Sequence, residues 1–167
     1  MKPLNARSTR SRWRHILPHS KLIYPTEPFD RIKYYFWRFY TPLHPVFRNI
    51  LVTLRIVHHY GRQEFLIGIV APNESLESVA IHLVAQGFGN DFVAWRDEGE
   101  VVSLRKVIDF KHQYHIRLFY DGEVRGHYEY TPEASPFLHL EEVDFFDKRE
   151  DFLAVLGELV VPHRPSV

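Results

Sequence analysis

The chain has 167 residues, of which 45% are hydrophobic and 15% aromatic, and this is enough to bury the core of one domain. It contains no cysteine, which excludes disulfides, thiolate metal sites and cysteine nucleophiles, and its apolar runs are far shorter than the roughly 20 residues of a membrane-spanning helix. With no secretory signal in the sequence, we expect a cytoplasmic protein without a transmembrane segment.

The formal net charge is zero, but the charges are unevenly divided along the chain. Residues 1–62 carry 12 Lys and Arg against two acidic residues, a balance of +10, and residues 63–167 carry 9 against 19, a balance of −10. This division predicts that the first part of the chain meets something acidic. Nucleic acid, an anionic surface and the acidic part of a protein, including a second copy of this chain, are all consistent with it.

Residues 1–24 are predicted to form a flexible basic arm in front of a single α+β domain that covers residues 25–167. The arm has no acidic residue and few apolar side chains, so burial cannot offset the entropy that ordering would cost. We expect its arginines to contact the acidic partner; they are Arg7, Arg10, Arg12 and Arg14.

A helix is predicted between Pro25 and Pro42, because Pro28 suits a first helical turn and Pro42 ends a helix. One face of this helix is apolar and is expected to pack on the core; it consists of Phe29, Ile32, Tyr35, Phe36 and Phe39. The other face mixes bases with aromatic rings, and we interpret it as a contact surface for a partner or for stacked bases, or as a solvated face. Its candidate binding residues are Lys33, Tyr34, Trp37 and Arg38.

Two strands, residues 50–57 and 64–71, are predicted to form a hairpin, because both are rich in apolar and β-branched residues. A helix is expected next, with Asn73 as its N-cap and Gly87 at its end. Its buried positions, Leu76, Val79, Ala80, Leu83 and Val84, follow the helical spacing.

Four further strands, residues 91–96, 101–108, 113–120 and 123–130, are predicted to form an antiparallel meander, and a last helix is expected over residues 148–160, started by Asp147. The fold class is therefore α+β: an antiparallel sheet of about six strands packed by two or three helices.

The turn at Asp121-Gly122 fixes the register of the last hairpin. A two-residue turn would place an apolar row and a polar row on the same face, whereas a three-residue loop with Gly122 in a left-handed bulge separates them. The second register places His115 opposite His127 on a polar face, which we expect to be a candidate site or an ordinary solvated surface. Its candidate catalytic residues are His115, Arg117, Arg125, His127 and Glu129.

Two functions are consistent with these patterns. The first is a non-catalytic binding or assembly protein that engages an acidic protein or nucleic acid through the basic arm and the aromatic helix. Assembly into a homo-oligomer is one form of this function. The second is a small phosphodiester hydrolase of the ribonuclease or toxin kind. In it, two imidazoles and a carboxylate bind a divalent metal or act as acid and base on a phosphate held by the arginines. No cofactor-binding motif is present, so we expect no organic cofactor.

Overall fold

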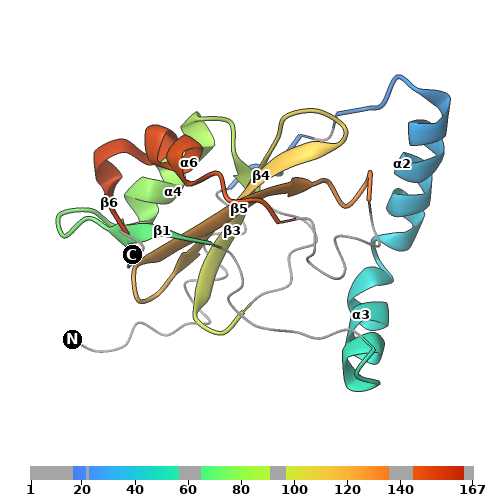
Figure 1. The fold of residues 1–167 in the computed structure, drawn as a ribbon, viewed down its shortest axis with the longest axis horizontal. Helices are drawn as coiled ribbons and strands as arrows, with labels where there is room; N and C mark the ends of the chain where they lie inside the picture. Colours follow the sequence, from blue (N-terminus) through green and yellow to red (C-terminus); the bar gives the residue numbers. More distant parts are fainter. Residues whose placement is uncertain (1–16, 22, 57–64, 91–96, 136–144, 164–167) are drawn as a thin grey trace.

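The computed structural model describes residues 17–21, 23–56, 65–90, 97–135 and 145–163. Within them the fold is α+β: a six-stranded antiparallel sheet with the strand order β2-β3-β4-β5-β1-β6, and four α-helices (Figure 1). The strands are β1 (Phe65–Val70), β2 (Gly89–Asn90), β3 (Glu100–Val107), β4 (His112–Phe119), β5 (Glu123–Tyr130) and β6 (Val160–Pro162). The helices are α2 (Pro28–Tyr40), α3 (His44–Thr53), α4 (Leu76–Ala85) and α6 (Arg149–Leu156).

The meander of β3, β4 and β5 confirms the predicted register. His115 lies opposite His127 and Ile116 opposite Gly126, while Gly122 has a φ of +86° at the turn. A residue with a side chain would be strained at that φ, whereas glycine is not. The predicted strand at residues 91–96 lies outside the described residues.

One face of the sheet is apolar and is covered by α4 and α6 (Figure 1). Gly126 leaves room here for two large neighbours, because a Cβ at this position would lie 3.0 Å from Ile67 Cδ1 and 3.1 Å from Phe152 Cζ. The N-cap of α4 is Ser75 and not Asn73. The Ser75 and Ser78 hydroxyl oxygens each accept a hydrogen bond of 3.0 Å from the backbone N–H of the other residue.

The predicted hairpin of residues 50–57 and 64–71 is wrong. Residues 44–53 form α3, with Pro45 in its first turn, so the apolar residues there follow helical spacing and not strand alternation. Strand β1 is confirmed, but it pairs with β5 and β6.

The predicted last helix is too long. Helix α6 ends at Leu156, since Gly157 leaves the helix with a φ of +55°, and Val160 begins strand β6. Asp147, expected to start this helix, is not its N-cap, since Lys148 occupies that position. Asp147 Oδ1 instead accepts a hydrogen bond from the Arg149 backbone N–H at 3.0 Å.

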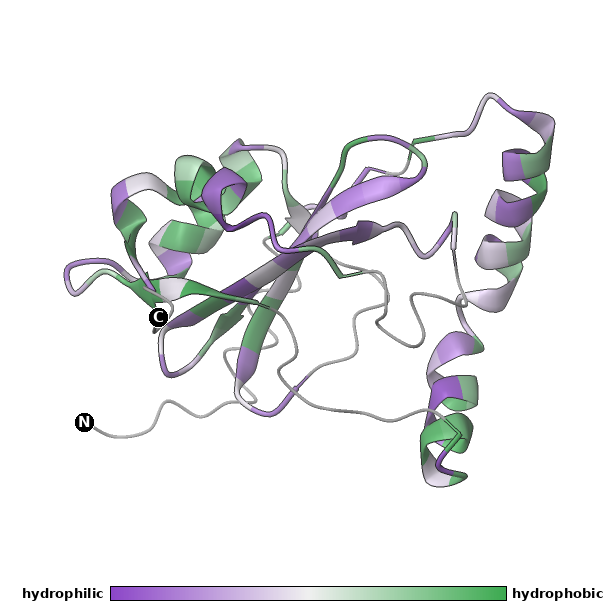
Figure 2. Ribbon diagram, in the orientation of Figure 1, coloured by the Kyte–Doolittle hydropathy of each residue, from purple (hydrophilic) through white to green (hydrophobic). Residues whose placement is uncertain are grey.

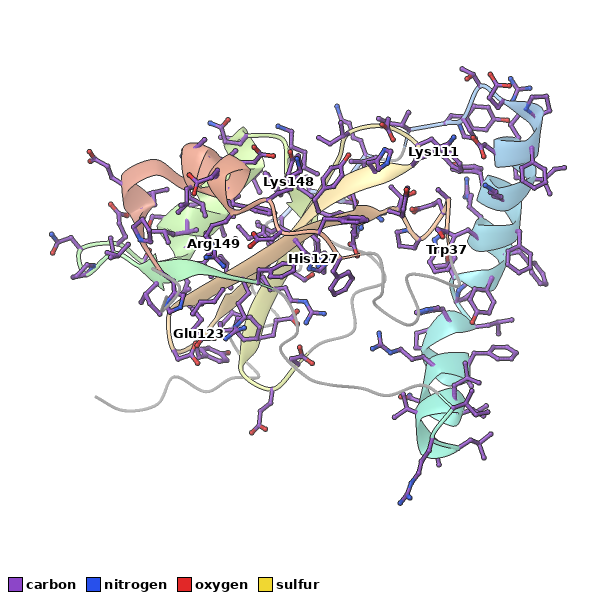
Figure 3. The ribbon with its side chains drawn as sticks, viewed as in Figure 1. Trp37, Lys111, Glu123, His127, Lys148 and Arg149 are labelled. Carbon is purple, nitrogen blue, oxygen red and sulfur yellow. The ribbon has the colours of Figure 1, made fainter. Side chains whose placement is uncertain are left out.

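Helix α2 is confirmed in its position, but its buried side is the reverse of the predicted one. Trp37, expected to face a partner, is 2% exposed and lies on the side of α2 toward the sheet (Figure 3). The five apolar residues expected in the core are 50–77% exposed. Figure 2 shows this hydrophobic side of α2 turned away from the sheet.

Part of the predicted arm is docked on the sheet. The Asn90 backbone N–H donates to the Pro18 carbonyl oxygen at 2.7 Å, and the Ser20 backbone N–H donates to the Asn90 carbonyl oxygen at 3.3 Å. Residues 17–20 therefore run alongside β2, and Leu17 enters the apolar core. Arg7, Arg10, Arg12 and Arg14 lie outside the described residues.

Candidate metal centre

The face of the sheet opposite α4 and α6 carries a row of polar side chains, which we call the polar layer. Its members on β3, β4 and β5 are Ser103, Arg105, Gln113, His115, Arg117, His127 and Glu129. All seven are buried, with 0–6% of their surface exposed. The interpretation as a solvated sheet face was therefore wrong. Buried polar groups must find partners within the protein, so the arrangement of this layer is strongly constrained.

Three side chains of the polar layer converge at the centre of the hairpin. His115 Nδ1 lies 3.4 Å from His127 Nε2 and 3.6 Å from Glu129 Oε1, and His127 Nε2 lies 3.0 Å from Glu129 Oε2. In the described part of the chain this is the one group of three or more metal-ligand side chains close enough to share an ion. The predicted register is what brings the two histidines together, since it places them opposite one another.

Neighbouring side chains hold two of these three residues in place. The Gln113 side-chain amide donates to Glu129 Oε1 at 2.6 Å, and Gln113 Oε1 accepts from Arg105 Nη1 at 3.1 Å. His115 Nε2 is 2.7 Å from Ser103 Oγ. When that nitrogen carries the proton and donates it to Ser103, the lone pair of His115 is on Nδ1 and faces the centre. Such outer partners commonly orient metal-binding histidines and carboxylates.

His127 is held in a different way. Its ring stacks on Phe145, with the centroids 3.6 Å apart and the planes inclined by 13°. Its Nδ1 is buried and has no hydrogen-bond partner among the residues that the structure describes, while its Nε2 points to Glu129 and His115. The stacking therefore fixes the orientation of the ring, and Nε2, the nitrogen with polar neighbours, is the one that faces the centre.

These separations match a tetrahedral metal site. Zinc bonds to nitrogen and oxygen are about 2.0–2.2 Å long, so two ligands of a tetrahedral zinc ion are about 3.3 Å apart. The two imidazole nitrogens, 3.4 Å apart, are close to that value. The nearest oxygen of Glu129 differs for the two histidines, Oε2 at 3.0 Å from His127 Nε2 and Oε1 at 3.6 Å from His115 Nδ1, and one ligand atom from each residue lies within 4.8 Å of the others. Two imidazoles and one carboxylate are also an established zinc ligand set. Comparisons of this chain with protein-family models, with curated proteins and with solved structures found no match.

The two arginines predicted to hold a phosphate already contact carboxylates. Arg117 Nη1 donates to Asp97 Oδ2 at 2.7 Å, and Arg117 Nε lies 3.5 Å from Glu100 Oε2. Arg125 Nε donates to Glu123 Oε2 at 2.7 Å. The guanidinium groups of Arg117 and Arg125 are thus paired with carboxylates of the protein.

The predicted binding residues of α2 differ in their exposure and in their contacts. Trp37 is buried and packs against Tyr40 and His44, while Tyr34 contacts Tyr24 and Tyr35 edge to face. Lys33 pairs with Asp30 at 3.3 Å, and Arg38 is exposed in the last turn. The burial of Trp37 removes this residue from the expected contact surface, whereas a partner contact of Lys33, Tyr34 and Arg38 stays a prediction.

Sequence reasoning found His115, His127 and Glu129 but missed the roles of Ser103, Arg105 and Phe145. The alternation within β3 contained a usable signal, because Ser103 and Arg105 are polar while Val102 and Leu104, on the other face, are apolar. Phe145 stacks on His127 from a segment distant in sequence, and no local pattern indicates such a contact.

Proposed function

We propose that this protein binds one divalent metal ion of the zinc class through His115, His127 and Glu129. The observation that carries the proposal is that one ligand atom from each of the three residues lies within 4.8 Å of the other two, with the two imidazole nitrogens 3.4 Å apart. Three acceptor atoms that face one point repel one another when they are neutral or anionic, so a positive centre among them is stabilising. The hydrogen bonds of Gln113 and Ser103 support the same geometry.

The burial of the ligands limits the access of a substrate to the ion. Two imidazoles and one carboxylate leave a fourth position for water or substrate, as in catalytic zinc sites, but His127 and Glu129 are each 0% exposed. Together with the carboxylate contacts of Arg117 and Arg125, this burial disfavours the predicted phosphodiester hydrolysis. A metal bound here would link β4 and β5 and add its binding free energy to the stability of the fold.

The binding or assembly function expected from the basic arm stays a prediction. Its four arginines lie outside the described residues, and a metal centre within the sheet is compatible with it.

Zinc titration of the full-length protein, first stripped with EDTA, tests the proposal. We expect calorimetry to give one ion per chain, and a rise in melting temperature that corresponds to about 2.7 kcal/mol when zinc is at 100 times its Kd. His127→Gln and Glu129→Gln should lose both effects. His112→Gln is the matched control, because His112 lies on β4, the strand of His115, with a side chain that is 30% exposed and outside the cluster.

A variant of an outer partner makes the test sharper. Ser103→Ala removes the hydroxyl that contacts His115 Nε2 and should weaken zinc binding by about 10- to 100-fold without abolishing it. If zinc neither binds the stripped protein nor changes its melting temperature, the three side chains share a proton instead and the proposal is wrong. The same conclusion follows if His127→Gln binds zinc as tightly as the unchanged protein.

A further inference from the structure

Helices α2 and α3 expose a continuous row of apolar side chains, which we call the apolar stripe. Its members are Phe29, Ile32, Tyr35, Phe36, Phe39, Leu43, Val46, Phe47, Ile50 and Leu54, each 44–77% exposed. Most follow one another at steps of three and four residues, the spacing of a single helical face. Contiguous exposed apolar surface of this kind marks an interaction site.

The stripe continues from one helix to the next. Thr41 and Leu43, on the two sides of Pro42, have right-handed helical dihedral angles, with φ and ψ of −46° and −48° and of −89° and −20°. The chain therefore bends at this point without reversing. Figure 1 shows both helices at one side of the molecule, apart from α4 and α6.

Basic residues border the stripe on α2. At 100° per residue, Arg31 and Arg38 lie along one edge of the stripe and Lys33 along the other. Lys33 Nζ lies 5.0 Å from the centre of the Phe29 ring and 3.3 Å from Asp30 Oδ1, so its charge stays at this edge of the stripe. An apolar face with cationic edges fits a surface that is apolar inside and anionic outside.

From these features we propose that α2 and α3 lie in the interface of an anionic lipid bilayer, with the apolar stripe among the acyl chains and the bases at the headgroups. Amphipathic helices with aromatic and aliphatic residues on one face and Lys or Arg beside it bind membranes in this way. The helix axis is parallel to the surface, and none of the described helices has the length and apolar character needed to cross a bilayer.

A second copy of this chain is a less suitable occupant. In a two-fold dimer the same surface meets itself, which would bring together two helix pairs whose residues 28–54 each carry four Lys and Arg against one Asp, a balance of +3. The break between α2 and α3 also interrupts the regular seam that two coiled helices require. Anionic lipid, in contrast, is complementary to this charge.

Co-flotation of the full-length protein with vesicles tests the proposal. One set of vesicles is phosphatidylcholine alone, and the other is phosphatidylcholine and phosphatidylserine in equal amounts. We expect binding to the anionic vesicles to exceed binding to the neutral ones by at least about tenfold, and to weaken with added salt.

The variant Phe29→Ser/Phe39→Ser removes two strongly exposed rings and so spares the folded core. It should bind anionic vesicles at least about tenfold more weakly. Ile81→Ser is the matched control, since Ile81 is 55% exposed on α4, outside the stripe, and should leave binding unchanged.

Two results would overturn the proposal. One is a full-length protein that ignores anionic vesicles, and the other is a double variant that binds them as well as the unchanged protein. Light scattering distinguishes the alternative occupant: a dimer that Phe29→Ser/Phe39→Ser dissociates, with no vesicle binding, assigns the stripe to a second copy. Neither measurement depends on zinc, so the metal proposal and this one can fail separately.

Discussion

The β4–β5 hairpin buries both of its faces, but with opposite chemistry. On one face Ile116, Leu118 and Val124 pack under α4 and α6, and each is 0% exposed. On the other face His127, Glu129 and Gln113 are equally buried, yet each depends on a directed contact of stated geometry. Apolar packing tolerates small shifts, whereas a polar layer loses stability when any one partner is misplaced. The two faces should therefore respond differently to substitution and to metal.

The largest expected effect is on the apolar face. Phe152→Ala removes a ring that is 1% exposed and that packs edge to face on Tyr114, so it should cost about 3–5 kcal/mol of unfolding free energy. Urea denaturation followed by circular dichroism measures this cost, which zinc should not change. Leu153→Ala, at a partly buried neighbour, is the control and should cost less. Equal costs for the two variants would contradict the apolar packing described for α6.

A smaller effect is expected on the polar layer. Gln113→Leu keeps the volume but removes the groups that bond Glu129 and Arg105, and should cost about 1–3 kcal/mol in the metal-free protein. It should also weaken zinc binding, because Glu129 loses the donor that orients it. Gln86→Leu, at an exposed position after α4, should alter neither quantity. A Gln113→Leu protein with unchanged zinc affinity would mean that this amide does not position the carboxylate.

The smallest effect concerns a titration at the border of the apolar face. Burial, with a hydrogen bond of 2.7 Å to Asp151, raises the pKa of Tyr114 from 10.0 to about 12. The folded protein thus keeps a proton that the unfolded chain loses, so this contribution to stability is present below pH 10.0 and is lost as the pH rises toward about 12. Tyr114→Phe should show a shallower fall in stability over that range, as read from urea midpoints. Tyr120→Phe, at an exposed tyrosine, should follow the unchanged protein.

The sequence predicted which residues share a face, but not which faces are buried. Alternation and the Gly122 bulge were sufficient to place His115 opposite His127, because both depend on local backbone geometry. The burial of the polar layer depends on tertiary contacts such as that of Phe145, and these leave no periodic signal. The sequence therefore left open whether this polar row is a site or a solvated surface, and the structure places it inside the protein.

The same limitation explains the errors in the first helices. A helical wheel identified the apolar side of α2 correctly, but the assumption that this side packs on the core was wrong, since Trp37 on the opposite side is the buried one. For α3, the prediction of a strand followed the β-branched residues of 50–57 and gave no weight to Pro45, which lies in the first turn of the helix. Hydrophobicity indicates a surface that avoids water, and it does not distinguish a core from an external partner.

The docking of residues 17–20 along β2 has a consequence for aggregation. Among the described strands, β2 is an edge strand of the sheet. The backbone N–H and C=O groups on the outer side of an edge strand are open to pairing with another chain. Asn90 instead bonds both ways with Pro18 and Ser20, and Gly89 permits the close approach, since any Cβ there would overlap the Ser20 backbone. Residues 17–20 thus cover this edge of the sheet. A side chain at position 89 would displace them and expose an edge strand that can pair with another chain and so promote aggregation.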